Sequence, residues 1–343
     1  MKRIFLSLLL LFALVSCAPQ SPAALTVLAH DSFAVSDEVV KAFEQDNNAK
    51  VTFMQGGDAG STLNKAILSK GAPLADILYG FDNTFLSRAL DAGIFEQYNS
   101  PMLADIPAEF KLSPANLALP VDYGDVCINY DKAYFAEHNL PVPGTLEDLL
   151  KPEYEGLLTV ENPSTSSPGL AFLLATRAHF GGDYLDYWKS LRTNDVVVVD
   201  SWETAYYTNF SGSSGKGPQA MVVSYATSPA AEVIFSPTPL TDAPTASIIG
   251  PDTCFRQIEF VGILRGTKQR ALAEKFVDFM LSTQFQEDMP TQMFVFPVNP
   301  NAKLPDAFLK YAQVPQNPAV LSPEEIAANR DQWIRDWTEV VLR

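Results

Sequence analysis

Residues 196–234 read VVVVDSWETAYYTNFSGSSGKGPQAMVVSYATSPAAEVI, and this stretch decides the fold class. Its two apolar runs, 196–199 and 221–223, are typical of strands that are covered on both faces. Each run ends in a polar, aromatic turn that opens a helix. We predict the first helix over residues 202–210. The second is predicted from Ser228, because serine is one of the residue types preferred at the N-cap position. Two such strand–turn–helix units favour an α/β sheet.

Three aromatic residues stand out in these turns. Trp202, Tyr206 and Tyr225 lie at or just beyond predicted strand ends, where ligands sit in open α/β sheets. Large aromatic side chains are often buried for packing alone, and that interpretation remains open for each of them. Their shared position favours a pocket for a flat, polar ligand.

The N-terminal part of the chain repeats the same alternation. Strands are predicted at 25–29, 50–54 and 76–80, each followed by a helix, which is typical of a doubly wound parallel sheet. The glycine-rich loop 56–61 before one helix matches neither of the two phosphate-binding glycine motifs. It predicts a tight turn at which the backbone can approach a ligand, or a backbone cradle for one.

Length and charge limit the classes of protein. The chain has 343 residues, enough for two α/β domains, and 24 basic against 40 acidic residues give a net charge of −16. This surface disfavours nucleic acid and is compatible with a cationic small molecule.

The N-terminus has the pattern of an export signal. Lys2 and Arg3 precede an apolar run, 4–15, that is too short to span a bilayer comfortably. The run leads into Leu-Val-Ser-Cys17, which resembles the bacterial lipobox, so we expect a signal peptide over residues 1–17 and lipid acylation of Cys17. Residues 18–24 are predicted to be a tether. The less favoured interpretation is a plain export leader with an incidental cysteine.

Two cysteines remain, Cys127 and Cys254. An oxidising compartment permits a disulfide, but spacing alone does not fix its geometry. We expect small buried hydrophobic side chains, with a disulfide as the less favoured alternative.

The assembled motifs resemble the thiamine-binding components of bacterial ABC importers, which are type II periplasmic binding proteins. The resemblance runs from about residue 25 to residue 342. It is carried by HDSFA (30–34), PVDYG (120–124), TSSPGL (165–170), WETAY (202–206), SYATSP (224–229), PT (290–291) before FPV (296–298), and SPEEIAANR (322–330) with Trp333 and Trp337.

The resemblance implies an α/β clamshell of two domains, each with a central, mostly parallel sheet flanked by helices. Domain 1 would comprise residues 25–122 and 256–300, and domain 2 residues 123–255. Residues 301–343 would form a C-terminal helical segment that packs on both. The two crossovers between the domains would be the hinge.

The same resemblance implies the site. The family's pyrimidine-side carboxylate falls on Asp58, its turn hydroxyl on Ser166, and its stacking aromatics on Trp202 and Tyr225. The sequence departs from the family at the first-strand tyrosine and at the tryptophan before the Pro-Val segment, which are His30 and Phe294 here. The full set of candidate ligand-binding residues is His30, Asp31, Asp58, Ser166, Trp202, Tyr206, Tyr225 and Phe294.

The implied function is capture of thiamine or a thiamine phosphate and its delivery to the permease and ATPase of an importer. We expect an exported monomer, anchored through Cys17 to the outer face of the cytoplasmic membrane or in the periplasm. It would need no cofactor, metal or catalytic residue, and would not bind nucleic acid.

Two rivals stay open. The first is a binding protein of the same fold that takes another ligand, such as ferric iron, a polyamine or a different pyrimidine. Adjacent tyrosines such as Tyr206 and Tyr207 can bind iron, but neighbouring side chains on a helix point apart. A lipid-anchored hydrolase is the other, although there is no G-x-S-x-G motif and His30, His138 and His179 are scattered.

Overall fold

The computed structural model describes residues 21–212 and 216–343. The expected signal peptide, Cys17 and the first residues of the expected tether lie outside the described residues. No helix within the described part of the chain is long and apolar enough to cross a membrane.

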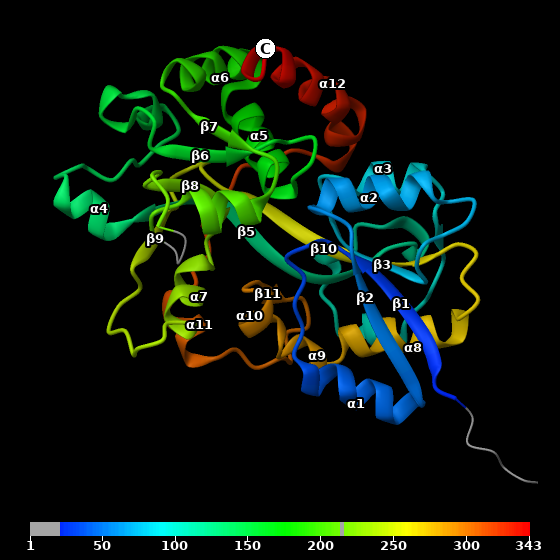
Figure 1. Ribbon diagram of the computed structural model, residues 1–343. Coiled ribbons are helices and arrows are strands. Elements are labelled where there is room, and N and C mark those ends of the chain that lie inside the picture. The colour runs from blue at the N-terminus through cyan, green and yellow to red at the C-terminus, as the bar shows by residue number, and fades with distance from the viewer. Residues whose placement is uncertain (1–20, 213–215) are drawn as a thin grey trace, which may run out of the picture.

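One mixed sheet runs through the whole molecule (Figure 1). Its strands are β1 (Ala23–Ala29), β2 (Ala49–Gln55), β3 (Ile77–Asp82), β4 (Phe95–Glu96), β5 (Leu119–Asp131), β6 (Leu158–Glu161), β7 (Val197–Val199), β8 (Met221–Tyr225), β9 (Thr245–Ile248), β10 (Phe255–Leu264) and β11 (Phe296–Pro297). The main path has the order β2-β1-β3-β10-β5-β8-β6-β7.

Helices cover the sheet. They are α1 (Asp37–Asn47), α2 (Ala59–Leu68), α3 (Leu86–Asp91), α4 (Lys132–Glu137), α5 (Ser167–Phe180), α6 (Tyr184–Thr193), α7 (Ser228–Ile234), α8 (Arg270–Leu281), α9 (Thr283–Gln286), α10 (Met289–Gln292), α11 (Asp306–Tyr311) and α12 (Pro323–Val341). Short 3-10 turns lie at Pro101–Ala104, Ala108–Phe110, Pro114–Asn116, Glu147–Leu150, Pro152–Tyr154 and Gly181–Asp183, and a π-helical turn spans Thr204–Asn209.

The pairing directions divide the sheet path into two parallel halves. Strand β1 pairs parallel with β2 and β3, and β6 pairs parallel with β7 and β8. Between them, β5 and β10 are antiparallel to each other and to their outer neighbours. The expected parallel α/β halves and two crossovers are therefore present, and the crossovers are long strands that lie side by side.

Strand β5 differs from its prediction. We expected two strand-like runs on either side of a bend at Tyr123–Gly124, but β5 continues through both residues over 13 positions. Partners on both of its edges explain this, because β10 pairs with Gly124 on one side and β11 with Tyr123 on the other. The hydrogen-bond ladder holds the glycine in extended conformation.

Other boundaries also depart from expectation. The run 196–199 gives an edge strand, β7, whose three residues are only half-buried because β6 is its single partner in the sheet. The second of the helices predicted from the opening stretch begins at Ser228, so its N-cap is Thr227. The region 290–300, expected to be extended, contains part of α10 as well as β11.

Cys127 and Cys254 form a disulfide, with an S–S distance of 2.09 Å and Cα atoms 4.3 Å apart. The expectation of two unpaired buried side chains is therefore wrong. The register explains the pairing: Val126 of β5 lies opposite Phe255 of β10, which brings the adjacent cysteines together. The disulfide joins the two crossover strands.

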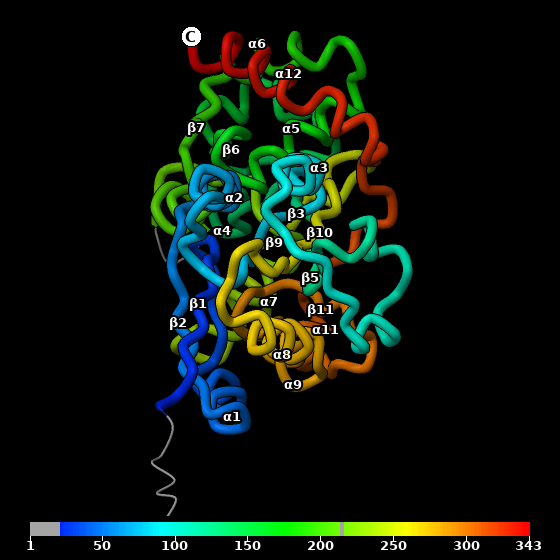
Figure 2. The backbone as a smooth tube through the Cα atoms, turned by 90° about the vertical axis from the view of Figure 1, so that its right-hand side faces the viewer, coloured from blue at the N-terminus to red at the C-terminus, as the bar shows by residue number. Residues whose placement is uncertain are grey.

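The C-terminal helix α12 packs along α6 and also reaches α3, and Figure 2 shows it at one end of the molecule beside α6. Trp337 packs edge-on against Trp188 of α6, with ring centroids 5.4 Å apart. Near its other end, the buried Arg330 donates to Ser87 Oγ at 3.3 Å. The helix thus contacts elements from both parallel halves.

His179, at the C-terminal end of α5, provides a pH-dependent contact. Its ring nitrogens lie 2.8 Å from Glu147 and 3.0 Å from Asp252. Burial alone would lower the pKa of His179, but the hydrogen bonds to these two carboxylates raise it. Because the folded pKa is raised, the stabilisation is complete below the unfolded pKa and is lost as pH rises through the folded value.

We therefore expect His179→Gln to lower the free energy of unfolding by about 0.5–1 kcal/mol at pH 5.5, because partly exposed ion pairs contribute on this scale. The difference from the wild type should shrink above pH 8. Urea unfolding at both pH values measures it. An equal loss at both would show that the charge of His179 contributes nothing.

Candidate functional site

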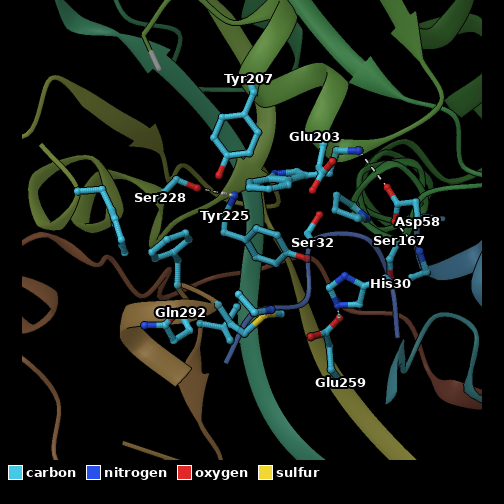
Figure 3. A pocket seen from close by; sticks show the side chains of 18 residues that line it. His30, Ser32, Asp58, Ser167, Glu203, Tyr207, Tyr225, Ser228, Glu259 and Gln292 are labelled. Carbon is cyan, nitrogen blue, oxygen red and sulfur yellow. Dashed lines mark hydrogen bonds and ion pairs between the residues drawn. The ribbon is translucent and has the colours of Figure 1, made fainter. Parts of the chain in front are cut away.

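A cavity of about 430 Å³ opens where the two halves of the sheet meet, and Figure 3 shows its lining side chains. They come from the ends of β1 and β8, the middle of β10, the starts of α2, α5 and α7, the π-helical turn with the residues before it, and the end of α10 with the segment after it. The lining residues are His30, Ser32, Ala34, Asp58, Ala59, Ser167, Pro168, Trp202, Glu203, Tyr207, Tyr225, Ser228, Phe235, Glu259, Gln292, Met293, Phe294 and Val295. Carboxyl ends of parallel strands gather at such a position, as the sequence predicted.

Trp202 is held rigidly at this site. Tyr206 stacks on its ring with centroids 5.1 Å apart and an interplanar angle of 16°. The indole Nε1–H donates to Ser224 Oγ at 2.9 Å, and Ser224 in turn lies 2.9 Å from Ser228 Oγ. Tyr206 therefore covers one face of the indole, and Ser224 fixes its N–H edge. Other parts of the Trp202 side chain line the cavity.

Tyr225 follows at the end of β8, with its ring centroid 6.5 Å from that of Trp202. Gly124 of β5 makes room for it, because a Cβ at that position would lie 2.9 Å from Tyr225 Cδ1. Burial, and then the neighbouring carboxylates, raise the pKa of Tyr225 well above its ordinary value. The phenol therefore stays neutral at physiological pH.

Asp58 is the N-cap of α2 and also bridges the two halves. Its Oδ1 accepts the Ala59 N–H at 2.6 Å, and its Oδ2 accepts the Trp202 N–H at 2.9 Å (Figure 3). Burial raises the pKa of Asp58, while these two N–H groups act in the opposite direction. Two residues further along, the Gly60 N–H donates to Thr165 O at 3.0 Å, so the start of α2 and the loop before α5 are in direct contact.

Asp82 forms a second polar link beneath the cavity. It accepts hydrogen bonds from Ser167 Oγ and from Gln257 Nε2, and both donors are buried. Burial raises the pKa of Asp82 to about 6, with the hydrogen bond from Ser167 opposing the shift.

The charge of the lining is one-sided. Asp58, Glu203 and Glu259 contribute carboxyl groups, whereas the lining side chains of the described chain include no lysine or arginine. Carboxylates and aromatic ring faces together favour a cation over an anion.

His30 and Glu259 lie at one end of the cavity, away from Tyr207 in the view of Figure 3. His30 Nε2 is 3.5 Å from Glu259 Oε1. The Tyr79 hydroxyl lies 2.5 Å from Asp122 Oδ2 and 3.1 Å from Glu259 Oε2, so its single hydrogen is shared between the two carboxyl groups. The two carboxylates belong to β10 and β5, so this network sits on the crossover strands.

Five of the eight predicted site residues line the cavity: His30, Asp58, Trp202, Tyr225 and Phe294. The structure places the other three just behind it. The Asp31 carboxylate accepts the Gly57 N–H at 2.8 Å, Ser166 is the fully buried N-cap position of α5, and Tyr206 backs Trp202 while its hydroxyl donates to Glu232.

Several lining residues were not predicted. Ser32 and Ser167 are direct neighbours of predicted residues and could have been found from the same motifs. Glu259 could also have been found from the sequence. It is an acidic residue within the apolar run 258–264 of a crossover strand, and burying a charge there is costly unless the charge has a role. Tyr207, Phe235 and Gln292 had none, because their positions depend on how distant segments pack.

Phe294 has an unusual backbone. Its φ of +59° is rare for a bulky residue and is a local strain of the kind that gathers at ligand sites. Its ring packs edge-on against Phe235, with centroids 5.1 Å apart. Beyond this pair an adjoining cavity of about 410 Å³ extends along Tyr206 and Glu232.

The arrangement of the tyrosine and histidine side chains argues against the two alternative functions, an iron-binding protein and a hydrolase. The rings of Tyr206 and Tyr207 do not point apart as expected but pack edge-on, with centroids 5.4 Å apart, and only Tyr207 lines the first cavity. Among the described residues, no group of three or more His, Cys, Asp or Glu side chains could hold a metal ion. His138 and His179 lie outside the cavity, so they cannot form a catalytic group with His30 there.

The sequence profile of the bacterial extracellular solute-binding proteins matches residues 72–316. The chain belongs to this family. It is therefore a solute-binding protein and not an enzyme.

Relatives and solved structures agree with this membership. The thiamine-binding periplasmic protein of Escherichia coli (strain K12) is 32% identical over 326 residues, covering 93% of this chain and 94% of that protein. Its counterpart in Brucella suis is 29% identical, covering 97% of each chain. A solved periplasmic thiamin binding protein superimposes with a TM-score of 0.83 at 30% identity, covering 94% of this chain and 97% of the other.

More distant structures share only the fold. The ferric binding protein of Campylobacter jejuni superimposes with a TM-score of 0.71 at 19% identity, covering 92% of this chain and 99% of the other. The α/β fold of the periplasmic binding proteins, expected from the motifs, is thus confirmed.

Proposed function

We propose that this protein captures thiamine in the cavity between its two halves and delivers it to an ABC importer. The observation that carries the proposal is the cavity itself, which combines the ring faces of Trp202 and Tyr225 with carboxylates and no basic side chain other than His30. The full-length similarity to proteins named for thiamine binding supports the same ligand.

The chemistry of thiamine suits this lining. Its thiazolium ring is a permanent cation that cannot lose its charge by deprotonation. A well-placed aromatic face contributes about 0.5–2 kcal/mol to the binding of such a cation. For a phosphate ester of thiamine, the N-terminus of the 14-residue helix α5, at Ser166 and Ser167, is the natural position for the phosphate.

We also propose that the two halves close on the ligand. Domain 1 would comprise residues 25–122 and 256–300 and domain 2 residues 123–255, so that β5 and β10 form the hinge. Residues 301–343 would pack on both. The contacts from Asp58 to Trp202 and from Gly60 to Thr165 would then belong to the closed form.

Isothermal titration calorimetry of the exported domain tests the ligand. Thiamine is expected to bind with a submicromolar to micromolar Kd, whereas spermidine and ferric citrate should give no heat of binding. Small-angle scattering on the same samples should show compaction with thiamine. Binding of ferric citrate or spermidine without binding of thiamine would overturn the proposal in favour of another solute.

The remaining elements of the proposal concern location and partners. The protein would be an exported monomer held at the membrane through Cys17, where it would meet the permease and ATPase of the importer. The lipobox-like sequence supports the anchor, and the periplasmic relatives support export.

Replacing Cys17 tests the anchor. The Cys17→Ser protein lacks the thiol that would be acylated, so it should move from the membrane fraction to the soluble fraction, while the wild type stays membrane-bound after a salt wash. Ser16→Ala, one residue away, is a matched control that should keep the anchor. Equal membrane retention of the Cys17→Ser protein would rule out lipid attachment at this residue.

A further inference from the structure

A hydrogen-bond donor and an acceptor lie side by side at one end of the cavity. His30 Nε2 and Glu259 Oε1 are 3.5 Å apart, and the two residues are only 8% and 7% exposed. His30 Nε2 makes no hydrogen bond within the described chain, while the Glu259 carboxyl accepts from Tyr79 through Oε2 and also interacts with the Asp122 carboxyl. A buried polar atom without a partner is costly, so an unpaired donor facing a cavity points to a ligand group.

The surroundings hold this pair in place. The Tyr79 hydroxyl binds the other oxygen of Glu259, which leaves Oε1 for the cavity. Gly80 has a positive φ of 86°, and a Cβ there would lie 2.1 Å from His30 Cδ2, so the backbone of β3 leaves space for the imidazole. Figure 3 shows both side chains directed toward each other at the same end of the cavity.

We propose that His30 and Glu259 together recognise the aminopyrimidine ring of the ligand, an inference that rests on the proposed function. An aminopyrimidine presents an amine donor next to a ring-nitrogen acceptor along one edge. Glu259 Oε1 accepts a hydrogen bond from the amine. His30, in the tautomer with its proton on Nε2, donates to the ring nitrogen.

This assignment differs from the one that places the aminopyrimidine on Asp58. Both oxygens of Asp58 already accept backbone N–H groups, from Ala59 and from Trp202. Asp58 thereby fixes the start of α2 against Trp202, which is a positioning role. His30 Nε2, in contrast, is a buried lining donor without a partner in the described chain, and it lies beside the Glu259 carboxyl.

Two ligands that differ only along this edge of the pyrimidine ring separate these roles. Oxythiamine carries a carbonyl in place of the amine of thiamine and a proton on the adjacent ring nitrogen, so it presents an acceptor to the Glu259 carboxylate and a donor to the His30 N–H. Calorimetry of the wild type should show thiamine binding about 10- to 100-fold more tightly than oxythiamine, the range for one lost hydrogen bond to a charged group. Glu259→Gln, which keeps the size and the contact with Tyr79, should narrow this preference to within about threefold.

Asp58→Asn is the comparison variant and should weaken both ligands by the same factor, leaving the preference unchanged. A preference that survives in Glu259→Gln but disappears in Asp58→Asn would overturn the assignment. Thermal unfolding checks that each variant is folded, and if Glu259→Gln is not, equal affinities of the wild type for the two ligands would still overturn it. If the wild type binds neither ligand, the proposed function itself fails.

Discussion

Replacing Trp202 with alanine is expected to weaken thiamine binding by roughly 30- to 1000-fold, the largest loss from any single side chain of the cavity. The change removes the ring area against the ligand and its attraction for the thiazolium charge, together about 2–4 kcal/mol. Calorimetry on the folded variant measures it. Trp202→Phe, which keeps an aromatic face but loses the Nε1–H bond to Ser224, should recover part of the affinity.

A control separates binding from stability. Trp333 on α12 is buried but does not line the cavity, so Trp333→Ala should lower the melting temperature without changing the Kd of the folded protein. Wild-type affinity for thiamine in a folded Trp202→Ala protein would show that Trp202 is only a packing residue.

Removing the disulfide should have the largest effect on stability. The bond between Cys127 and Cys254 closes a loop with a sequence separation of 127 residues, and such a loop greatly restricts the unfolded chain. Replacing both cysteines with alanine is expected to lower the free energy of unfolding by about 3–5 kcal/mol. Guanidinium unfolding of the wild type and the double variant gives this difference.

Reductant supplies the internal control for this experiment. It should shift the unfolding midpoint of the wild type toward that of the double variant and leave the variant itself unchanged. If the wild type and the variant unfold at the same denaturant concentration under oxidising conditions, the bond contributes nothing to the fold.

Local patterns in the sequence predict most of the individual elements. Apolar runs give β3 and β8, and Ser322 followed by Pro-Glu-Glu begins α12, where the Ser322 hydroxyl accepts the Glu325 N–H at 3.1 Å. These features depend on residues within one turn or one strand, so the information lies close together in the chain.

Features that depend on the pairing of distant strands could not be predicted in this way. The disulfide and the contact of His30 with Glu259 both follow from the position of β10 in the sheet, next to β3 on one side and β5 on the other. Nothing near Cys254 or Glu259 in the sequence specifies this register.

The roles within the aromatic cluster show the same limit. Helical spacing places Tyr206 and Tyr207 on different faces, but it does not say which face meets the cavity. The structure assigns Tyr206 to the support of Trp202 and Tyr207 to the lining, because the π-helical turn Thr204–Asn209 sets their rotation. A local helix distortion of this kind leaves no clear mark in the sequence.

Native mass spectrometry of the protein as purified, before and after addition of thiamine, tests the central proposal most directly. We expect a 1:1 complex whose added mass equals that of thiamine or of one of its phosphates, and its loss in the Trp202→Ala variant. A co-purified species of a different mass that thiamine cannot displace would contradict the assignment of thiamine as the solute.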